Sequence, residues 1–258
     1  MNYRSSPTAF HRSARIDRAP RPSAPLLALL ALASLPAVAA APPSERNFSV
    51  SGFDRVRIDG PYQVTLRTNV APYARATGTP VSLDGVSIKV EGRTLVVRSG
   101  GGGWGGYPGE GRGPVTIEVG THDLSAAYIN GSGALLVDRV KGLGFEMTIQ
   151  GAGTARIDQV DVDQLKVGIA GSGSSRLAGR AAKLTTTVRG TSSLEADGLQ
   201  VNDAVIGAEG PSIVRMAVTN SAKVDATGLA SVTLTGDPAC AVKASGSANV
   251  VGCKEGRY

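Results

Sequence analysis

Two aspartates and two arginines recur at an interval of twenty residues, and they are the side chains best placed to do chemistry. Asp138 and Asp158 form one such pair, and Arg156 and Arg176 form the other. If repeated units stack, the two carboxylates come within about 5 Å, close enough to share a calcium ion or to raise one pKa. Two neighbouring guanidiniums could grip a carboxylate or sulfate group of a glycan. The aspartates would suit an enzyme acting on an acidic polysaccharide, and the arginines a binding surface.

Both pairs also have simpler structural explanations. Aspartate is common at strand ends because it favours turns, and the aspartate column is broken at Ala178. Outward arginines, including Arg215 two units further on, keep a strand face solvated and discourage aggregation. We therefore predict no catalytic residue, and we keep Arg156, Arg176 and Arg215 as weak candidates for binding.

Other catalytic constellations are scarce in the sequence. After residue 41 the chain has one histidine, His122, which precedes Asp123 at an expected turn. The motifs G-x-S-x-G and H-E-x-x-H and the phosphate-binding loop are missing. We expect neither a cofactor nor a metal ion.

The two cysteines, Cys240 and Cys253, lie near the C-terminus. Redox catalysis would favour a closer pair such as C-x-x-C. In an oxidising compartment a single disulfide between them is the natural expectation.

Residues 1–41 have the composition of an export signal. Five arginines precede an apolar run that begins at Leu26, and small residues follow up to Ala41. Ser34 and Pro36 interrupt the apolar run, so a retained membrane anchor is the weaker alternative. Removing residues 1–39 takes away five arginines and one aspartate and lowers the formal charge from +6 to +2. This small charge argues against nucleic-acid binding. We expect an exported protein, periplasmic or extracellular, with no membrane span after the leader is removed.

The elements that would position the candidate residues come from a repeat of 18 to 20 residues. Its units begin at seven glycines: Gly131, Gly151, Gly171, Gly190, Gly210, Gly228 and Gly246. Four and six residues after each glycine, and two, four and six residues before the next, side chains are mostly apolar, with polar residues between them. This alternation predicts two strands per unit, each with one buried face. Equivalent columns in every unit predict an all-β fold, a parallel β-solenoid with one unit per coil, whereas a β-sandwich would space its strands less regularly.

Small residues stand two places after each leading glycine, from Gly133 to Ala248. We expect a tight corner there, where glycine allows a positive φ and a larger side chain would crowd the next coil.

The segment 47–129 alternates less regularly and is expected to form the first coils or a cap that covers an open sheet edge. The strands expected within it are 54–58, 62–66, 86–90, 94–98, 115–119 and 124–129. Pro72, Pro80 and the Asp84-Gly85 pair fit connecting turns.

Residues 100–113 are more than half glycine and predict a surface loop. Trp104 and Tyr107 within it could stack on a sugar or a partner, although a simple spacer is the favoured explanation of the loop. We expect residues 42–258 to form one domain, with regular coils over 131–252.

The recurring G-S-G and G-A-G units, after a start of the form F-D-R-V-R-I-D-G-P-Y-Q-V-T-L, resemble the bacterial GIN-domain family, the autotransporter adhesin head domain. The resemblance spans roughly residues 48–252. It implies a right-handed parallel β-helix in the envelope or outside the cell, a role in adhesion, and no catalytic residues. The family label also implies a membrane translocator, and only six residues follow Gly252, so we expect export to end in the periplasm or to use separate machinery.

The leading functional hypothesis is a non-catalytic exported solenoid that binds a glycan, an envelope polymer or a protein on its outer faces. One alternative is a β-helix enzyme acting on an acidic polysaccharide through Asp138, Asp158 and nearby arginines. A second alternative is a structural envelope protein that self-associates through its ends.

Overall fold

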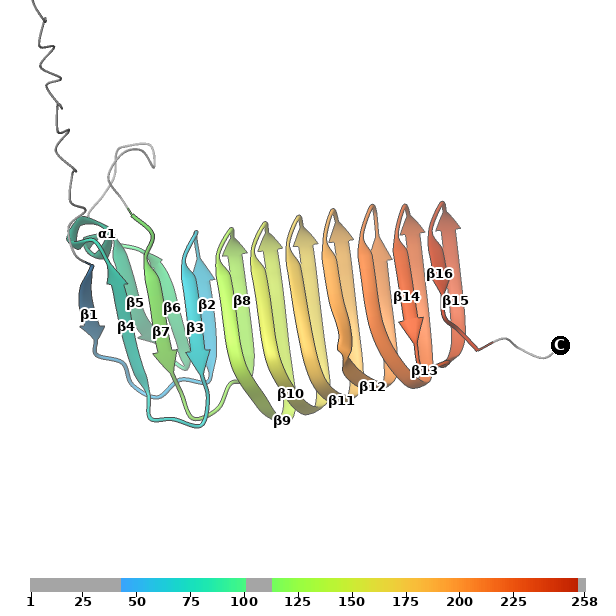
Figure 1. The fold of residues 1–258 in the computed structure, drawn as a ribbon, viewed down its shortest axis with the longest axis horizontal. Helices are drawn as coiled ribbons and strands as arrows, with labels where there is room; N and C mark the ends of the chain where they lie inside the picture. The colour runs from blue at the N-terminus through green and yellow to red at the C-terminus, as the bar shows by residue number, and fades with distance from the viewer. Residues whose placement is uncertain (1–42, 101–112, 255–258) are drawn as a thin grey trace, which may run out of the picture. The chain divides into compact units, whose positions relative to one another are not determined.

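The structure is a computed structural model that describes residues 43–100 and 113–254. These residues form sixteen strands and one short helix (Figure 1). The N-terminal elements are β1 (Ser44–Phe48), β2 (Arg55–Asp59), β3 (Gln63–Arg67), β4 (Tyr73–Gly78), α1 (Pro80–Asp84), β5 (Val86–Glu91), β6 (Thr94–Ser99), β7 (Thr116–Gly120) and β8 (Ala126–Gly131). The later strands are β9 (Ala134–Gly151), β10 (Thr154–Gly171), β11 (Ser174–Gly190), β12 (Ser193–Glu209), β13 (Ile213–Gly228), β14 (Ser231–Thr235), β15 (Ala239–Gly246) and β16 (Asn249–Val251). Within the described ranges no helix has the length and apolar character needed to cross a bilayer.

Successive coils stack in parallel and in register, which confirms the predicted β-solenoid. Ile157 of β10 lies opposite Val137 of β9 on one side and Leu177 of β11 on the other. Strands β9 to β13 are 16 to 18 residues long because each continues through a bend instead of stopping there. Figure 1 shows them as neighbouring rungs with a tight turn at one end and a broad bend at the other.

The bend in each long strand gives the solenoid two sheet faces. The first face consists of β1, β4, β7 and β3, the N-terminal parts of β9 to β13, and then β14 and β16. The second face consists of β5, β6, β2 and β8, the C-terminal parts of β9 to β13, and then β15. Segments that are distant in the sequence therefore become neighbours on one face.

The core lies between the two faces and is filled by the inward columns that the repeat predicts. In β9 the inward side chains of Leu135, Val137, Phe145, Met147 and Ile149 are all buried. Columns of aliphatic groups repeat in the coils above, so most of the stabilisation comes from apolar burial between neighbouring coils. The last coil differs, because no described coil covers it and its inward Val242 is 47% exposed.

The glycines at the tight turns do two different jobs. The leading glycines have the positive φ, as at Gly151 (φ 106°), where a Cβ would also lie 2.8 Å from the carbonyl oxygen of Gly131. Two residues later, at Gly153, there is no room for a side chain, because a Cβ would lie 2.6 Å from Cγ2 of Ile129. The expectation of a positive φ at this second position was wrong, and the expectation of crowding there is confirmed.

The irregular N-terminal segment contains all six expected strands and three elements that the repeat did not predict. These are β1, β4 and α1, with β1 and β4 pairing antiparallel at the start of the first face. Pro80 opens α1 instead of making a connecting turn, and Thr79 caps the helix by accepting a hydrogen bond from the backbone N–H of Ser82 (3.2 Å). The expectations for the leader 1–41 and for Trp104 and Tyr107 lie outside the described residues.

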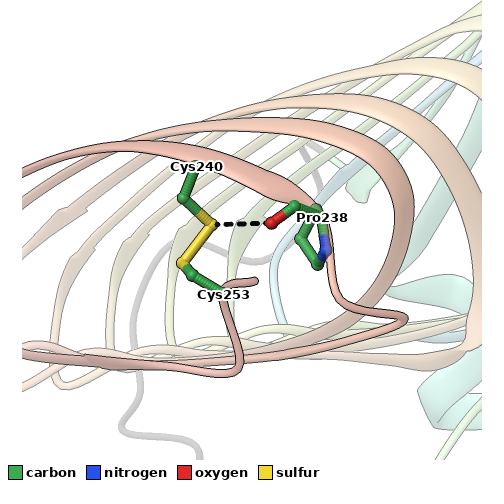
Figure 2. The surroundings of a disulfide bond; sticks show 3 residues. All are labelled: Pro238, Cys240 and Cys253. Carbon is green, nitrogen blue, oxygen red and sulfur yellow. Dashed lines mark hydrogen bonds between the residues drawn. A yellow bond between two sulfur atoms is a disulfide. The ribbon is translucent and has the colours of Figure 1, made fainter. Parts of the chain in front are cut away.

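The predicted disulfide between Cys240 and Cys253 is present and joins the start of β15 to the residues after β16. Figure 2 shows it beside Pro238, whose carbonyl oxygen lies 3.6 Å from Sγ of Cys240. A disulfide sulfur carries no proton, so this is a close contact and not a hydrogen bond. The same carbonyl accepts a hydrogen bond from the backbone N–H of Lys254 (3.0 Å), which ties the end of the last coil to its bend.

Candidate functional site

The arginine column on the first face is present, and two of its members are already paired with carboxylates. Arg156 and Arg176 lie opposite each other in adjacent strands. Nε of Arg156 is 2.6 Å from Oδ1 of Asp158, and Nη2 of Arg176 is 2.5 Å from Oε2 of Glu195. Arg215 makes no ion pair with any other described residue. An acidic ligand on this column would compete with protein carboxylates at two of its three arginines.

The aspartate pair also lies in register, because its neighbours in β9 and β10 are paired. Oδ1 of Asp138 accepts hydrogen bonds from the backbone N–H groups of Thr68 (3.0 Å) and Arg139 (2.6 Å). Asp158 instead accepts from Arg156 (2.6 Å). Each carboxylate therefore has its own structural partners. The expected strand end was wrong, because Asp138 and Asp158 lie inside the long strands β9 and β10, just after the part that belongs to the first face. Across residues 43–100 and 113–254 no three His, Cys, Asp or Glu side chains gather as a metal site requires.

A hollow of about 450 Å³ lies on the outside of the second face, across β5, β6, β2, β8 and β9. Its apolar lining is Val96 and the ring of Tyr128. Val96 is only 6% exposed although it lies outside the core cluster, so its neighbours on the outer surface cover it. The polar lining consists of Arg57, Glu91, Thr94, Asn130, Thr148 and Gln150.

Strand register brings these residues together from distant parts of the chain. Arg57 of β2 lies between Val96 of β6 and Tyr128 of β8, and Tyr128 lies opposite Thr148 of β9. Asn130 is likewise opposite Gln150. Side chains at these positions share one face because alternate residues of a strand point the same way.

The charged groups of the hollow are neutralised within the protein. Oδ1 of Asp59, opposite Asn130 in the strand register, accepts from Nδ2 of Asn130 (2.6 Å) and from Nε of Arg57 (2.9 Å). Glu91 is paired with Arg98 (3.3 Å). Partial burial raises the pKa of Asp59, but the hydrogen bonds from Asn130 and Arg57 outweigh it and leave the pKa below its usual value. Asp59 therefore stays ionised and fixes both neighbours.

The stabilisation that three ionised aspartates contribute should be lost only in strongly acid solution. Like Asp59, two further aspartates have a lowered pKa. The pKa of Asp161 is lowered mainly by its hydrogen bond from Arg180, and the pKa of Asp203 is lowered by hydrogen bonds from Ser221 and Asn220. Folded pKa values below the unfolded value of 3.8 stabilise the protein above that pH, and the stabilisation is lost as the pH falls through the folded values. Urea unfolding across the pH range should show no loss above about pH 5 from these groups. A loss that begins near neutrality and disappears in an Asp203→Asn variant would contradict this, because it would trace the loss to Asp203.

Sequence reasoning missed the hollow, although a signal for part of it was present. Tyr128 and Asn130 stand one repeat of twenty residues before Thr148 and Gln150, so extending the repeat backwards by one unit would have aligned them. Arg57 carries no such signal, because β2 reaches the site through pairing with β8 outside the regular repeat.

The sequence matches the family model described as "Putative auto-transporter adhesin, head GIN domain" over residues 52–238, which includes the hollow and the arginine column. The chain belongs to this family. No curated protein matches the chain.

Solved structures resemble this GIN domain in fold. A putative adhesin from Bacteroides fragilis has a TM-score of 0.69 at 17% identity, covering 83% of this chain and 96% of that one. A putative lipid binding protein from Parabacteroides distasonis has a TM-score of 0.63 at 19% identity, covering 81% and 96%. A putative adhesin from Parabacteroides merdae has a TM-score of 0.63 at 17% identity, covering 81% and 95%. At these identities the likeness shows a shared fold.

Proposed function

We propose that this GIN domain, comprising residues 42–258, is exported and acts as a non-catalytic, adhesin-like module that holds an envelope polymer, a glycan or a protein on its outer faces. The observation that carries the proposal is the hollow on the second face. Its lining joins an aromatic ring and a buried valine to a rim of hydroxyl, carboxamide and charged groups, as binding sites commonly do.

Hydrolysis of an acidic polysaccharide is less well supported by the same residues. A cleavage site needs a carboxylate and a cation that converge on one substrate position. Asp138 is held by backbone N–H groups, and Asp158 is paired with Arg156 along its own strand. Both aspartates are therefore held by structural partners within their coils, which favours a binding role over a catalytic one.

Envelope binding can be tested by co-sedimentation of the mature protein with isolated bacterial envelopes and with their purified polysaccharide. We expect saturable co-sedimentation without release of new reducing ends. The double variant Arg156→Ala, Arg176→Ala reports on the first face, and Tyr128→Ala reports on the second. Absence of saturable binding would contradict the binding role, and time-dependent depolymerisation would contradict the non-catalytic one.

Export can be tested separately by cell fractionation and N-terminal sequencing. The small residues from Ala37 to Ala41 lead us to expect a mature chain that begins after Ala39 or Ala40. Recovery of the full chain in the cytoplasm would contradict export.

Self-association is a second candidate function, favoured by the last coil. Val242 of β15 and Val251 of β16 are 47% and 44% exposed, and both strands have an edge that no other described strand pairs with. If two copies join there, sedimentation velocity should show a mass that rises with concentration, and Val242→Lys should abolish the rise. A constant monomer mass would exclude this role.

A further inference from the structure

We propose that the hollow on the second face is a binding site for an uncharged oligosaccharide, with Tyr128 as its stacking platform. This inference rests on the proposed function of the domain as an outer-face binding module. It assigns that function to one place and to one chemical class of ligand.

The apolar lining of the hollow, Val96 and the ring of Tyr128, suits the flat face of a sugar. Tyr128 of β8 is half-buried, and Val96 of β6 is buried. One strand, β2, lies between them and places Arg57 opposite both residues. An aromatic ring held in this way offers a rigid flat surface at little cost in conformational entropy. The C–H face of a sugar ring is flat and apolar and complements such a surface.

The rim provides hydrogen-bonding groups of the neutral kind. Asn130 uses one N–H on Asp59, which fixes its carboxamide and leaves its oxygen and second N–H for other partners. The side chains of Thr148 and Gln150 make no hydrogen bond to another side chain among the described residues. Carboxamides and hydroxyls both donate and accept, as sugar hydroxyls require.

The charges argue for an uncharged ligand. Arg57 is paired with Asp59, and Glu91 is paired with Arg98. The two arginines and the two carboxylates balance to a net charge of zero, so the hollow has no excess positive charge to attract an acidic sugar. A neutral sugar leaves both ion pairs intact.

The dimensions fit a short oligosaccharide. Five adjacent strands spaced about 4.8 Å apart span roughly 19 Å from the first to the last. A volume of about 450 Å³ lies within the usual range for small-molecule sites.

The experiment is a binding titration of the mature protein with panels of uncharged hexose oligosaccharides and of matched uronic-acid oligosaccharides. We expect binding to uncharged members that changes little with salt. Tyr128→Ala should weaken binding about tenfold or more, whereas Tyr128→Phe should retain it within about threefold because the ring remains. Gln150→Ala, at an exposed position, should weaken binding without loss of stability.

Thr187→Ala is the control outside the hollow, since Thr187 lies in the same outward column as Thr148 but two strands away. It should bind like the wild type, and thermal unfolding should confirm that every variant is folded. Three outcomes would overturn the inference: binding to acidic oligosaccharides only, unchanged binding by Tyr128→Ala, or no oligosaccharide binding. If the protein still co-sediments with envelopes in any of these cases, the assignment of the site fails and the proposed function stands. If the protein does not co-sediment with envelopes either, the assignment of the site and the proposed function both fail.

Discussion

Replacing Gly171 by alanine is expected to lower the free energy of unfolding by about 3 kcal/mol or more, while the same change at Gly168 in the same strand should be neutral or stabilising by up to about 1 kcal/mol. Gly171 has a φ of 112°, and a Cβ there would lie 2.6 Å from the carbonyl oxygen of Gly151 in the coil below. The strain cannot relax without separating two coils. At Gly168 the nearest atom to a Cβ is Oγ1 of Thr148 at 3.8 Å, and the φ is ordinary.

Urea unfolding of the two variants beside the wild type measures this difference directly. Both variants replace a glycine of β10 by alanine, so the effect of the substitution on the unfolded chain is the same in each and cancels in the comparison. Equal stabilities for Gly168→Ala and Gly171→Ala would show that the tight turns do not pack coil on coil as described.

Loss of the disulfide should have the second large effect, confined to the C-terminal coil. Cys240 and Cys253 are 13 residues apart, and closing a loop of about this length stabilises by about 3 kcal/mol. The last coil needs this link because, within residues 43–100 and 113–254, it packs against one neighbouring coil and exposes Val242. In a repeat architecture the loss should stay local, since each coil contacts only its neighbours.

Amide hydrogen exchange resolved along the chain tests the locality. In the double variant Cys240→Ser, Cys253→Ser, exchange should accelerate strongly in β15 and β16 and stay unchanged in β9 and β10. Reduction of the wild type should reproduce the pattern. Uniform acceleration over all strands would mean that the coils unfold together and that the disulfide stabilises the whole domain.

The repeat in the sequence was sufficient to predict the coils, because stacking makes equivalent columns face equivalent surroundings. Val137, Ile157 and Leu177 share a spacing, a polarity and a place in the core. The two cysteines were likewise predictable as a pair. The coils and the disulfide could be predicted because they depend on the alternation of apolar and polar residues and on the number of cysteines, and both can be read directly from the sequence.

The parts that escaped prediction depend on pairing between unlike segments. Strands β1 and β4 pair antiparallel and belong to no repeated unit, so their columns have no counterparts to align with. Arg57 joins the hollow because β2 pairs with β8 across 71 residues, as the hydrogen bond between Asn130 and Asp59 shows. The repeat places Glu195 beside Arg176, one coil further on, but only side-chain geometry shows that Arg156 pairs with Asp158 in its own strand.

The stacked register is the central claim, because it builds both the core and the hollow. One outward column of the second face contains Gln150, Ala170, Arg189, Glu209, Thr227 and Ser245 in consecutive coils. Pairs of spin labels at Ala170 and Thr227, Gln150 and Thr227, and Gln150 and Ser245 span three, four and five coil steps. The backbone separations of these pairs are about 14, 19 and 24 Å. Pulsed dipolar EPR spectroscopy should therefore find label-to-label distances that rise by about 4.8 Å per coil. Distances that do not rise in step with coil number would contradict the solenoid and the hollow built on it.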